Sequence, residues 1–183
     1  MIGLKRGTVK LMVHQKEWTE NAEHTMEILR EILGSAALDI QHVGSTSIFS
    51  ICAKPIIDLV VGVRDLNDIQ PYMEQLKQNG IIFRGGDAPE QLLFVMGDFE
   101  NDTRTHHIHV VKWNGEEWKN YVNFRDYLNA NVEKARLYEE CKQKLARQFP
   151  NDRGSYTAGK EEVICQLLQE ASTWRTSSIS GYG

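Results

Sequence analysis

The chain has 183 residues, 41% of them hydrophobic, and a net charge of −4, which suits one soluble domain with a substantial core. The acidic balance argues against a nucleic-acid binder that relies on a broad basic surface, although a local basic groove is compatible with it. No apolar run approaches the length of a membrane span or a signal peptide. The three cysteines, Cys52, Cys141 and Cys165, form no CxxC pair, which favours reduced thiols and a cytoplasmic location.

The first two thirds of the chain are predicted to combine helices with short strands. Apolar residues recur at helical spacing over 17–33, with Thr19 as a candidate N-cap and Gly34 as the stop. A second helix has Asp65 or Asn67 as its candidate cap. Strands are expected over residues 8–13, 38–43, 55–63, 81–84, 91–96 and 105–113.

The last third of the chain is predicted to be helical. Beyond residue 115, aromatic and apolar residues recur every three to four positions, in runs that residues 150–154 interrupt. Thr157 is a candidate cap for the final helix. Residues 176–183 are small and polar and are expected to form a mobile tail. The layout predicts a single α+β domain over residues 1–175, with a mixed sheet followed by a helical C-terminal third.

The first candidate site combines a small-residue turn with a lone acid. Gly44-Ser45 follows a predicted strand, and Asp58 is the only acid in the apolar run 55–63. Backbone N–H groups after such a turn can face an anion, and the carboxylate can ligate a hard cation such as Mg²⁺. The alternative is a tight turn before a core strand, with Asp58 satisfied by nearby backbone donors.

The second candidate site is the histidine-rich run from Arg104 to Lys112. Strand alternation places His107 and His109 on one face and His106 on the other. Two imidazoles on one face suit a metal or a phosphate, and they gain significance if this strand lies beside the one that carries Asp58. The alternative is one imidazole bonded in the core and the others at a solvated edge.

Arg125 is a third candidate, because it shares a helix face with Trp118, Val122 and Leu128. An arginine on an apolar face usually has an anion to meet. That anion is Asp58, Asp126 of the same helix, or a ligand phosphate.

Familiar nucleotide-binding motifs are absent: the chain has no GxxxxGK[ST] and no GxGxxG after a predicted strand. Two tyrosine–lysine pairs one helical turn apart, Tyr138 with Lys142 and Tyr156 with Lys160, are candidates to line a phosphate pocket. A solvated helix surface is the favoured interpretation of each pair.

Five motifs together resemble the GrpB-like family, whose members occur alone and fused to bacterial dephospho-CoA kinases. The resemblance covers about residues 14–172, and its motifs are His42-Val-Gly-Ser-Thr-Ser47, Ala53-Lys-Pro-Ile-Ile-Asp58, His107-Ile-His-Val-Val111, Phe124-Arg-Asp-Tyr-Leu128 and Tyr156-Thr-Ala-Gly-Lys160. It implies a nucleotidyltransferase-like fold, a mixed sheet flanked by helices with the Gly-Ser turn and an acidic strand at the cleft.

The chain departs from that pattern at two places. The wider superfamily carries two acids on the strand after the turn, but here the second position is Val60, or Ile56 if Asp58 is itself the second acid. Two-metal chemistry needs that second carboxylate. The loop 47–51 also reads Ser-Ile-Phe-Ser-Ile where the family usually has Ser-Val-Pro-Gly-Leu, so a fixed turn is lost.

The resemblance implies a nucleotidyl- or phosphoryl-transferase with Mg²⁺ or Mn²⁺ and a nucleotide or other phosphate-bearing small molecule as its partner. Catalysis and metal binding are assigned to Asp58, His107 and His109. Phosphate binding is assigned to Gly44, Ser45, Thr46, Ser47, Lys54, Arg125 and Lys160. The alternative is a binding module that has kept the fold and holds a nucleotide or coenzyme without turnover.

Overall fold

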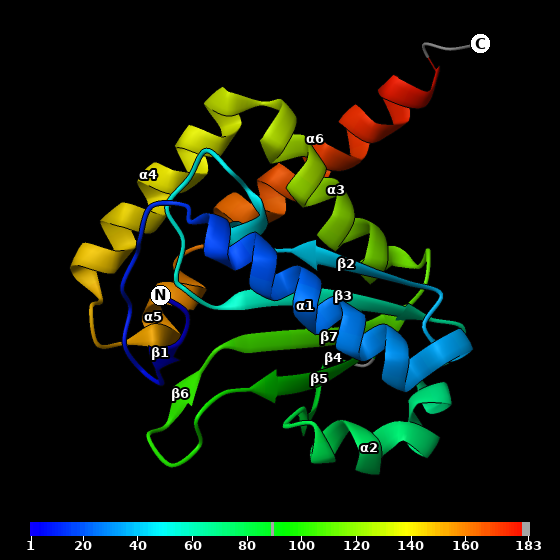
Figure 1. Cartoon of the computed structure of the whole chain (residues 1–183). Helices are drawn as coiled ribbons and strands as arrows, with labels where there is room; N and C mark the ends of the chain where they lie inside the picture. Colours follow the sequence, from blue (N-terminus) through cyan, green and yellow to red (C-terminus); the bar gives the residue numbers. More distant parts are fainter. Residues whose placement is uncertain (89, 181–183) are drawn as a thin grey trace.

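A mixed five-stranded sheet forms the centre of the computed structural model, which describes residues 1–88 and 90–180 (Figure 1). Its strands, in the order in which they lie side by side, are β2 (Asp39–Val43), β3 (Ile57–Val63), β7 (His106–Lys112), β5 (Gln91–Met96) and β4 (Ile82–Ala88). Only β3 and β7 are parallel, and the other neighbours are antiparallel. The predicted mixed sheet and the strands that build it are confirmed.

Helices pack against both faces of the sheet, and side chains that alternate along β3 contact them in turn. Leu59 and Val61 contribute to the larger core, which is closed by α1 (Lys16–Leu33). Val60 points to the opposite face and packs with Trp118 of α3 (Glu116–Ala130). The nearly unbroken apolar run of β3 therefore reflects a strand that is buried on both sides.

The helix α1 lies where periodicity predicts it, but its N-cap is a different residue. Its N-cap is Gln15, whose side chain makes no capping hydrogen bond, whereas Thr19 lies inside the first turns. The second predicted helix is divided in two: a 3-10 helix, Leu66–Tyr72, is capped by Asp65 and precedes the short α2 (Met73–Gln78).

The C-terminal third is helical, as predicted, and packs around its own core on the α3 side of the sheet (Figure 1). Its further helices are α4 (Val132–Gln148), α5 (Arg153–Ala158) and α6 (Glu161–Ser180). Thr157 lies within α5, so the proposed cap is wrong, and Asp152 caps α5 instead. Residues 176–180, expected to belong to a mobile tail, continue α6, while residues 181–183 lie outside the described part.

The N-terminal segment does not form the predicted strand over residues 8–13. Instead β1 (Leu4–Lys5) pairs with β6 (Thr103–Arg104), and a single bridge joins Met12 to Ala53. In the described ranges, 1–88 and 90–180, no helix is both long enough and apolar enough to traverse a bilayer.

The topology brings three candidate segments together at one end of neighbouring strands. Val43 at the end of β2 pairs with Asp58 near the start of β3, and Asp58 pairs with His107 near the start of β7. Because β7 is parallel to β3 and β2 is antiparallel to it, the turn after β2 and the starts of β3 and β7 meet at this end of the strands.

Candidate functional site

The glycine–serine turn lies directly against the acidic side chain of β3. Gly44 has a φ of +70°, in the left-handed region that favours glycine. A Cβ atom at Gly44 would lie 2.5 Å from Oδ2 of Asp58. Only a residue without a side chain lets the turn and the carboxylate approach this closely. Ser45–Ser47 then forms one turn of 3-10 helix.

The carboxylate of Asp58 faces the imidazoles of His107 and His109, which strand alternation predicted to lie on one face. His107 Nδ1 lies 3.2 Å from Asp58 Oδ1, and His109 Nε2 lies 3.8 Å from the same oxygen. Burial raises the pKa of the Asp58 carboxyl, but the interactions with His107 and His109 outweigh this effect and hold it well below its usual range. Asp58 is therefore ionised at neutral pH.

The third histidine of the run points away from this cluster, as alternation predicts. His106 is buried on the opposite face, and its Nε2 lies 3.2 Å from Oγ1 of Thr25 on α1. Burial lowers the pKa of His106 to about 4, so it is neutral at pH 7. It is a core histidine.

Buried apolar residues occupy the positions at which a second strand acid would be expected. Val60 is fully buried and packs against Trp118 of α3, and Ile56, the other position considered, is also buried. The strand therefore offers one carboxylate where two-metal chemistry needs two. Within residues 1–88 and 90–180, no group of three or more His, Cys, Asp or Glu side chains is arranged to hold a metal ion. The residues therefore do not fit a protein-held two-metal centre.

One further contact explains why His107 is poorly arranged as a metal ligand. Arg153 Nη2 lies 3.4 Å from Nε2 of His107, while Nδ1 of the same ring faces Asp58. An arginine only donates, so this geometry favours the tautomer with a lone pair on Nε2 and a hydrogen on Nδ1. That hydrogen is donated to Asp58 and occupies the nitrogen that would bind a metal beside the carboxylate.

A cavity of about 230 Å³ opens beside Asp58 and His107. Gly44 and Ser45 form one wall. Three cationic side chains contribute to the rest of its lining: Lys54, Arg153 and Lys160. With three cations and one carboxylate, the cavity is electropositive although the whole chain carries a net negative charge.

The two lysines of this cavity converge on one aromatic ring. Lys54 Nζ lies 5.1 Å and Lys160 Nζ 4.6 Å from the ring centroid of Tyr156. In the described part of the chain, neither ammonium makes a hydrogen bond or an ion pair. Burial, followed by the charges of Arg153 and Lys160, lowers the pKa of Lys54 to about 8, and burial likewise lowers that of Lys160. Such cations gain from an incoming anion.

Both tyrosines and Lys142 are buried and Lys160 is partly buried, which corrects the interpretation of the two pairs as solvated helix surface. Tyr156 is 1% exposed and Tyr138 is 4% exposed, and both line the cavity. Lys142 is also buried but lies outside the cavity lining, and its ammonium donates to the backbone carbonyl of Cys52. Lys142 thus fastens the loop before β3 to α4.

Arg125 does not line this cavity, contrary to its assignment to phosphate. Its Nη1 donates to the side-chain oxygen of Gln41 and to the carbonyl of His42, both at 2.9 Å. Its Nε donates to Asp126 at 2.8 Å, and Asp126 also pairs with Arg175 of α6. The anion that meets Arg125 is Asp126, one of the three considered, and the network fastens α3 to β2 and α6.

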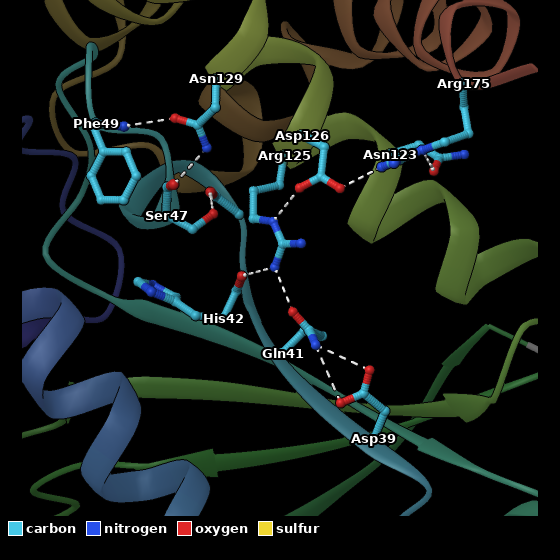
Figure 2. A network of polar contacts seen from close by, with 11 residues as sticks. Asp39, Gln41, His42, Ser47, Phe49, Asn123, Arg125, Asp126, Asn129 and Arg175 are labelled. Carbon is cyan, nitrogen blue, oxygen red and sulfur yellow. Dashed lines mark hydrogen bonds and ion pairs between the residues drawn. The ribbon is translucent and has the colours of Figure 1, made fainter. Parts of the chain in front are cut away.

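Thr46 and Ser47 also lie behind the turn rather than in the cavity lining. Thr46 Oγ1 is 2.9 Å from Nε2 of His42, and Ser47 Oγ donates to the carbonyl of Gly44 at 2.7 Å. Asn129 of α3 donates to the carbonyl of Ser47 (Figure 2). These two residues hold the turn in shape, whereas Gly44 and Ser45 face the cavity.

Sequence reasoning missed Arg153. It lies in the interruption 150–154, which has the composition of a turn, and nothing in its neighbours marks it as a site residue. The structure makes it the first residue of α5 and brings it to His107, 46 positions away along the chain.

The fold is that of the nucleotidyltransferases. The solved structure of a cytoplasmic RNA terminal U-transferase matches this chain with a TM-score of 0.52. The match covers 75% of this chain and 41% of that one. At 15% identity the likeness shows the fold alone.

Within that fold class the chain belongs to the GrpB family, whose model, described as GrpB protein, matches residues 8–170. The glutamate-rich protein GrpB of Alkalihalophilus pseudofirmus is 39% identical over 93% of this chain and 99% of its own. The crystal structure of conserved protein GrpB from Enterococcus faecalis matches with a TM-score of 0.83 and 28% identity, covering 90% of this chain and 99% of that one. A dephospho-CoA kinase of Mycolicibacterium paratuberculosis is 25% identical over 96% of this chain but only 49% of its own length.

Proposed function

We propose that this protein binds a nucleotide, or another small molecule that carries phosphate, in the cavity between the Gly44–Ser45 turn and α5. The observation that carries the proposal is the convergence of Lys54, Arg153 and Lys160 on a cavity of about 230 Å³. Burying like charges together costs free energy, and a phosphate group supplies the compensating negative charge. The nucleotidyltransferase-like fold supports the same class of ligand.

Group transfer is the second candidate, and the cluster of Asp58 with His107 favours it. Asp58 accepts a hydrogen bond from Nδ1 of His107 and so orients the ring, whose Nε2 lies on the side of Arg153. An acceptor hydroxyl that displaced Arg153 from Nε2 would meet a general base. If the nucleotide binds with Mg²⁺ or Mn²⁺, Asp58 is the strand carboxylate that would hold the ion, which would supply charge neutralisation at the phosphates.

The test of binding compares cavity lysines with an exposed one. The affinities of nucleoside triphosphates and coenzyme A precursors, with Mg²⁺ or Mn²⁺, are measured by titration calorimetry for wild type, Lys54→Ala, Lys160→Ala and Lys144→Ala. Lys144 is exposed on α4 and controls for the loss of one charge. A charge-assisted hydrogen bond contributes about 1.5–3 kcal/mol, so each cavity variant should weaken binding about 10- to 100-fold.

Equal affinities in all three variants, or no binding by any of these ligands, would overturn the proposal. Turnover is then assayed with the ligand that binds. Transfer requires that His107→Asn lowers the rate while leaving the affinity within a few-fold, because the base acts in the chemical step. A protein that binds tightly and shows no turnover with any acceptor tested is the binding module.

A further inference from the structure

A second cavity, of about 250 Å³, lies between α3 and α6 and adjoins the cationic one. The two cavities share Gly44, Phe124 and Tyr138 in their linings. Phe124 and Tyr138 meet edge to face, with ring centroids 5.4 Å apart. The boundary between the cavities is therefore made of two aromatic rings and a residue without a side chain.

The walls of the second cavity are mainly apolar. Tyr121 and Phe124 come from α3, one turn apart, and Ile164 and Leu168 come from α6, also one turn apart. All four side chains are only partly buried, although α3 and α6 pack together along this side of the molecule (Figure 1). Aromatic and branched aliphatic walls of this kind suit a flat, poorly hydrated ring.

Two polar side chains complete the lining. Glu117 and Asn120 lie on the same face of α3 as the aromatic pair, each one helical turn before one of the two rings. Among the described residues, neither side chain has a hydrogen-bond or ion-pair partner. The amide of Asn120 offers both a donor and an acceptor, and the carboxylate of Glu117 offers acceptors. An apolar slot with both kinds of group at one side matches a heterocycle whose edge carries N–H groups and ring nitrogens or carbonyls.

We infer that this second cavity holds the base of a nucleotide whose phosphates lie in the cationic cavity. The inference rests on the proposed function and narrows its ligand to a nucleotide. The phosphates need the three cations, the base needs aromatic walls and hydrogen-bonding partners, and the shared residues put these two environments in contact. A ligand with an aliphatic tail would leave Asn120 and Glu117 without partners, which is unfavourable in a half-buried slot.

The test separates the base from the phosphates. Affinities of ATP, GTP, CTP, UTP and inorganic tripolyphosphate, all with Mg²⁺, are measured by titration calorimetry. We expect at least one nucleotide to bind ten times more tightly than tripolyphosphate. Leu168→Trp fills the second cavity and should remove that advantage while leaving the tripolyphosphate affinity unchanged. Gln169→Trp introduces the same ring at the adjacent exposed position and should change neither affinity.

Asn120→Ala provides a second variant that creates no bulk and should lower the affinity of the preferred nucleotide about tenfold. It carries the test if melting curves show that Leu168→Trp does not fold. Two outcomes overturn the inference. In the first, tripolyphosphate and all four nucleotides bind equally well; in the second, Leu168→Trp and Asn120→Ala weaken both classes of probe equally. Either outcome leaves the proposed phosphate site in the cationic cavity standing. If neither tripolyphosphate nor any nucleotide binds, the proposed function itself fails.

Discussion

At the scale of single residues, Gly44 illustrates how one missing side chain shapes the site. Two separate properties require glycine there: a φ of +70° and a neighbouring carboxylate oxygen 2.5 Å from where a Cβ would lie. The first is a property of the local chain and is visible in a Gly-Ser turn. The second depends on β2 and β3 being neighbours, which a single stretch of sequence does not reveal.

Gly44→Ala should therefore destabilise the protein more than a comparable change at a turn with free space. Gly80 is the matched control, because its φ is +75° and no atom lies within 4 Å of the place that a Cβ would take. We expect Gly80→Ala to lower the free energy of unfolding by about 1 kcal/mol and Gly44→Ala by about 3 kcal/mol. Urea denaturation measures both, and equal losses would show that contact with Asp58 is unimportant.

At the scale of elements, Arg125 joins parts of the chain that lie far apart in the sequence. Its guanidinium connects α3 to β2, and its partner Asp126 connects α3 to α6 through Arg175 (Figure 2). The sequence correctly marked Arg125 as an arginine in need of an anion. It did not decide among the three anions, because that choice depends on how α3 lies across the sheet.

Arg125→Met should consequently affect stability and not ligand affinity. The variant leaves the Gln41 and His42 oxygens without this donor, and we expect the free energy of unfolding to fall by about 2–3 kcal/mol. Arg136→Met, at an exposed position of α4, should change it by less than about 0.5 kcal/mol. Urea denaturation gives the stabilities and calorimetry the affinity for tripolyphosphate. A loss of affinity in correctly folded Arg125→Met would restore this residue to the phosphate site.

At the scale of the whole molecule, buried lysines make the stability depend on pH. Burial, followed by the charge of Lys160, lowers the pKa of Lys142 to about 7 in the folded protein. In the unfolded chain the pKa of this lysine has its ordinary value of 10.5. Between these two values the unfolded state binds more protons than the folded one, so the free energy of unfolding rises with pH. Below pH 7 both states are protonated and the cost of the buried charge is fully present.

Lys142→Met should reduce the rise in stability between about pH 7 and pH 10, whereas Lys144→Met, which removes an exposed charge from the same helix, should leave it unchanged. Urea denaturation at several pH values gives the slopes. Parallel curves for wild type and Lys142→Met would show that Lys142 keeps an ordinary pKa in the folded state. The absolute stability of Lys142→Met also includes the loss of the hydrogen bond to Cys52, so the slope is the informative quantity.

Local periodicity determined most of the secondary structure. The strand pattern located β5 at the residues observed and placed His107 with His109 on one face, and the helical spacing located α1 and the helical C-terminal third. Periodicity predicted the secondary structure less well in two segments. The segment 8–13 has apolar residues but no strand partner beyond one bridge. The predicted second helix begins as a 3-10 helix, which contains Pro71, and becomes α-helical only from Met73.

The sequence by itself therefore predicted the α+β layout, the Gly44–Ser45 turn before the strand that carries Asp58, and the placement of His107 and His109 on one face, because each depends on residues close together in the chain. Only the tertiary structure brought the strand of these histidines beside Asp58. Only the tertiary structure decided that Arg153 reaches His107, and that Lys54 and Lys160 lie over one ring. Arg153 and Tyr156 reach the site on α5, which packs against α4 and shares a core with Val9 and Leu145. No local pattern encodes which distant cations share a cavity, since that depends on how whole elements bury their apolar faces.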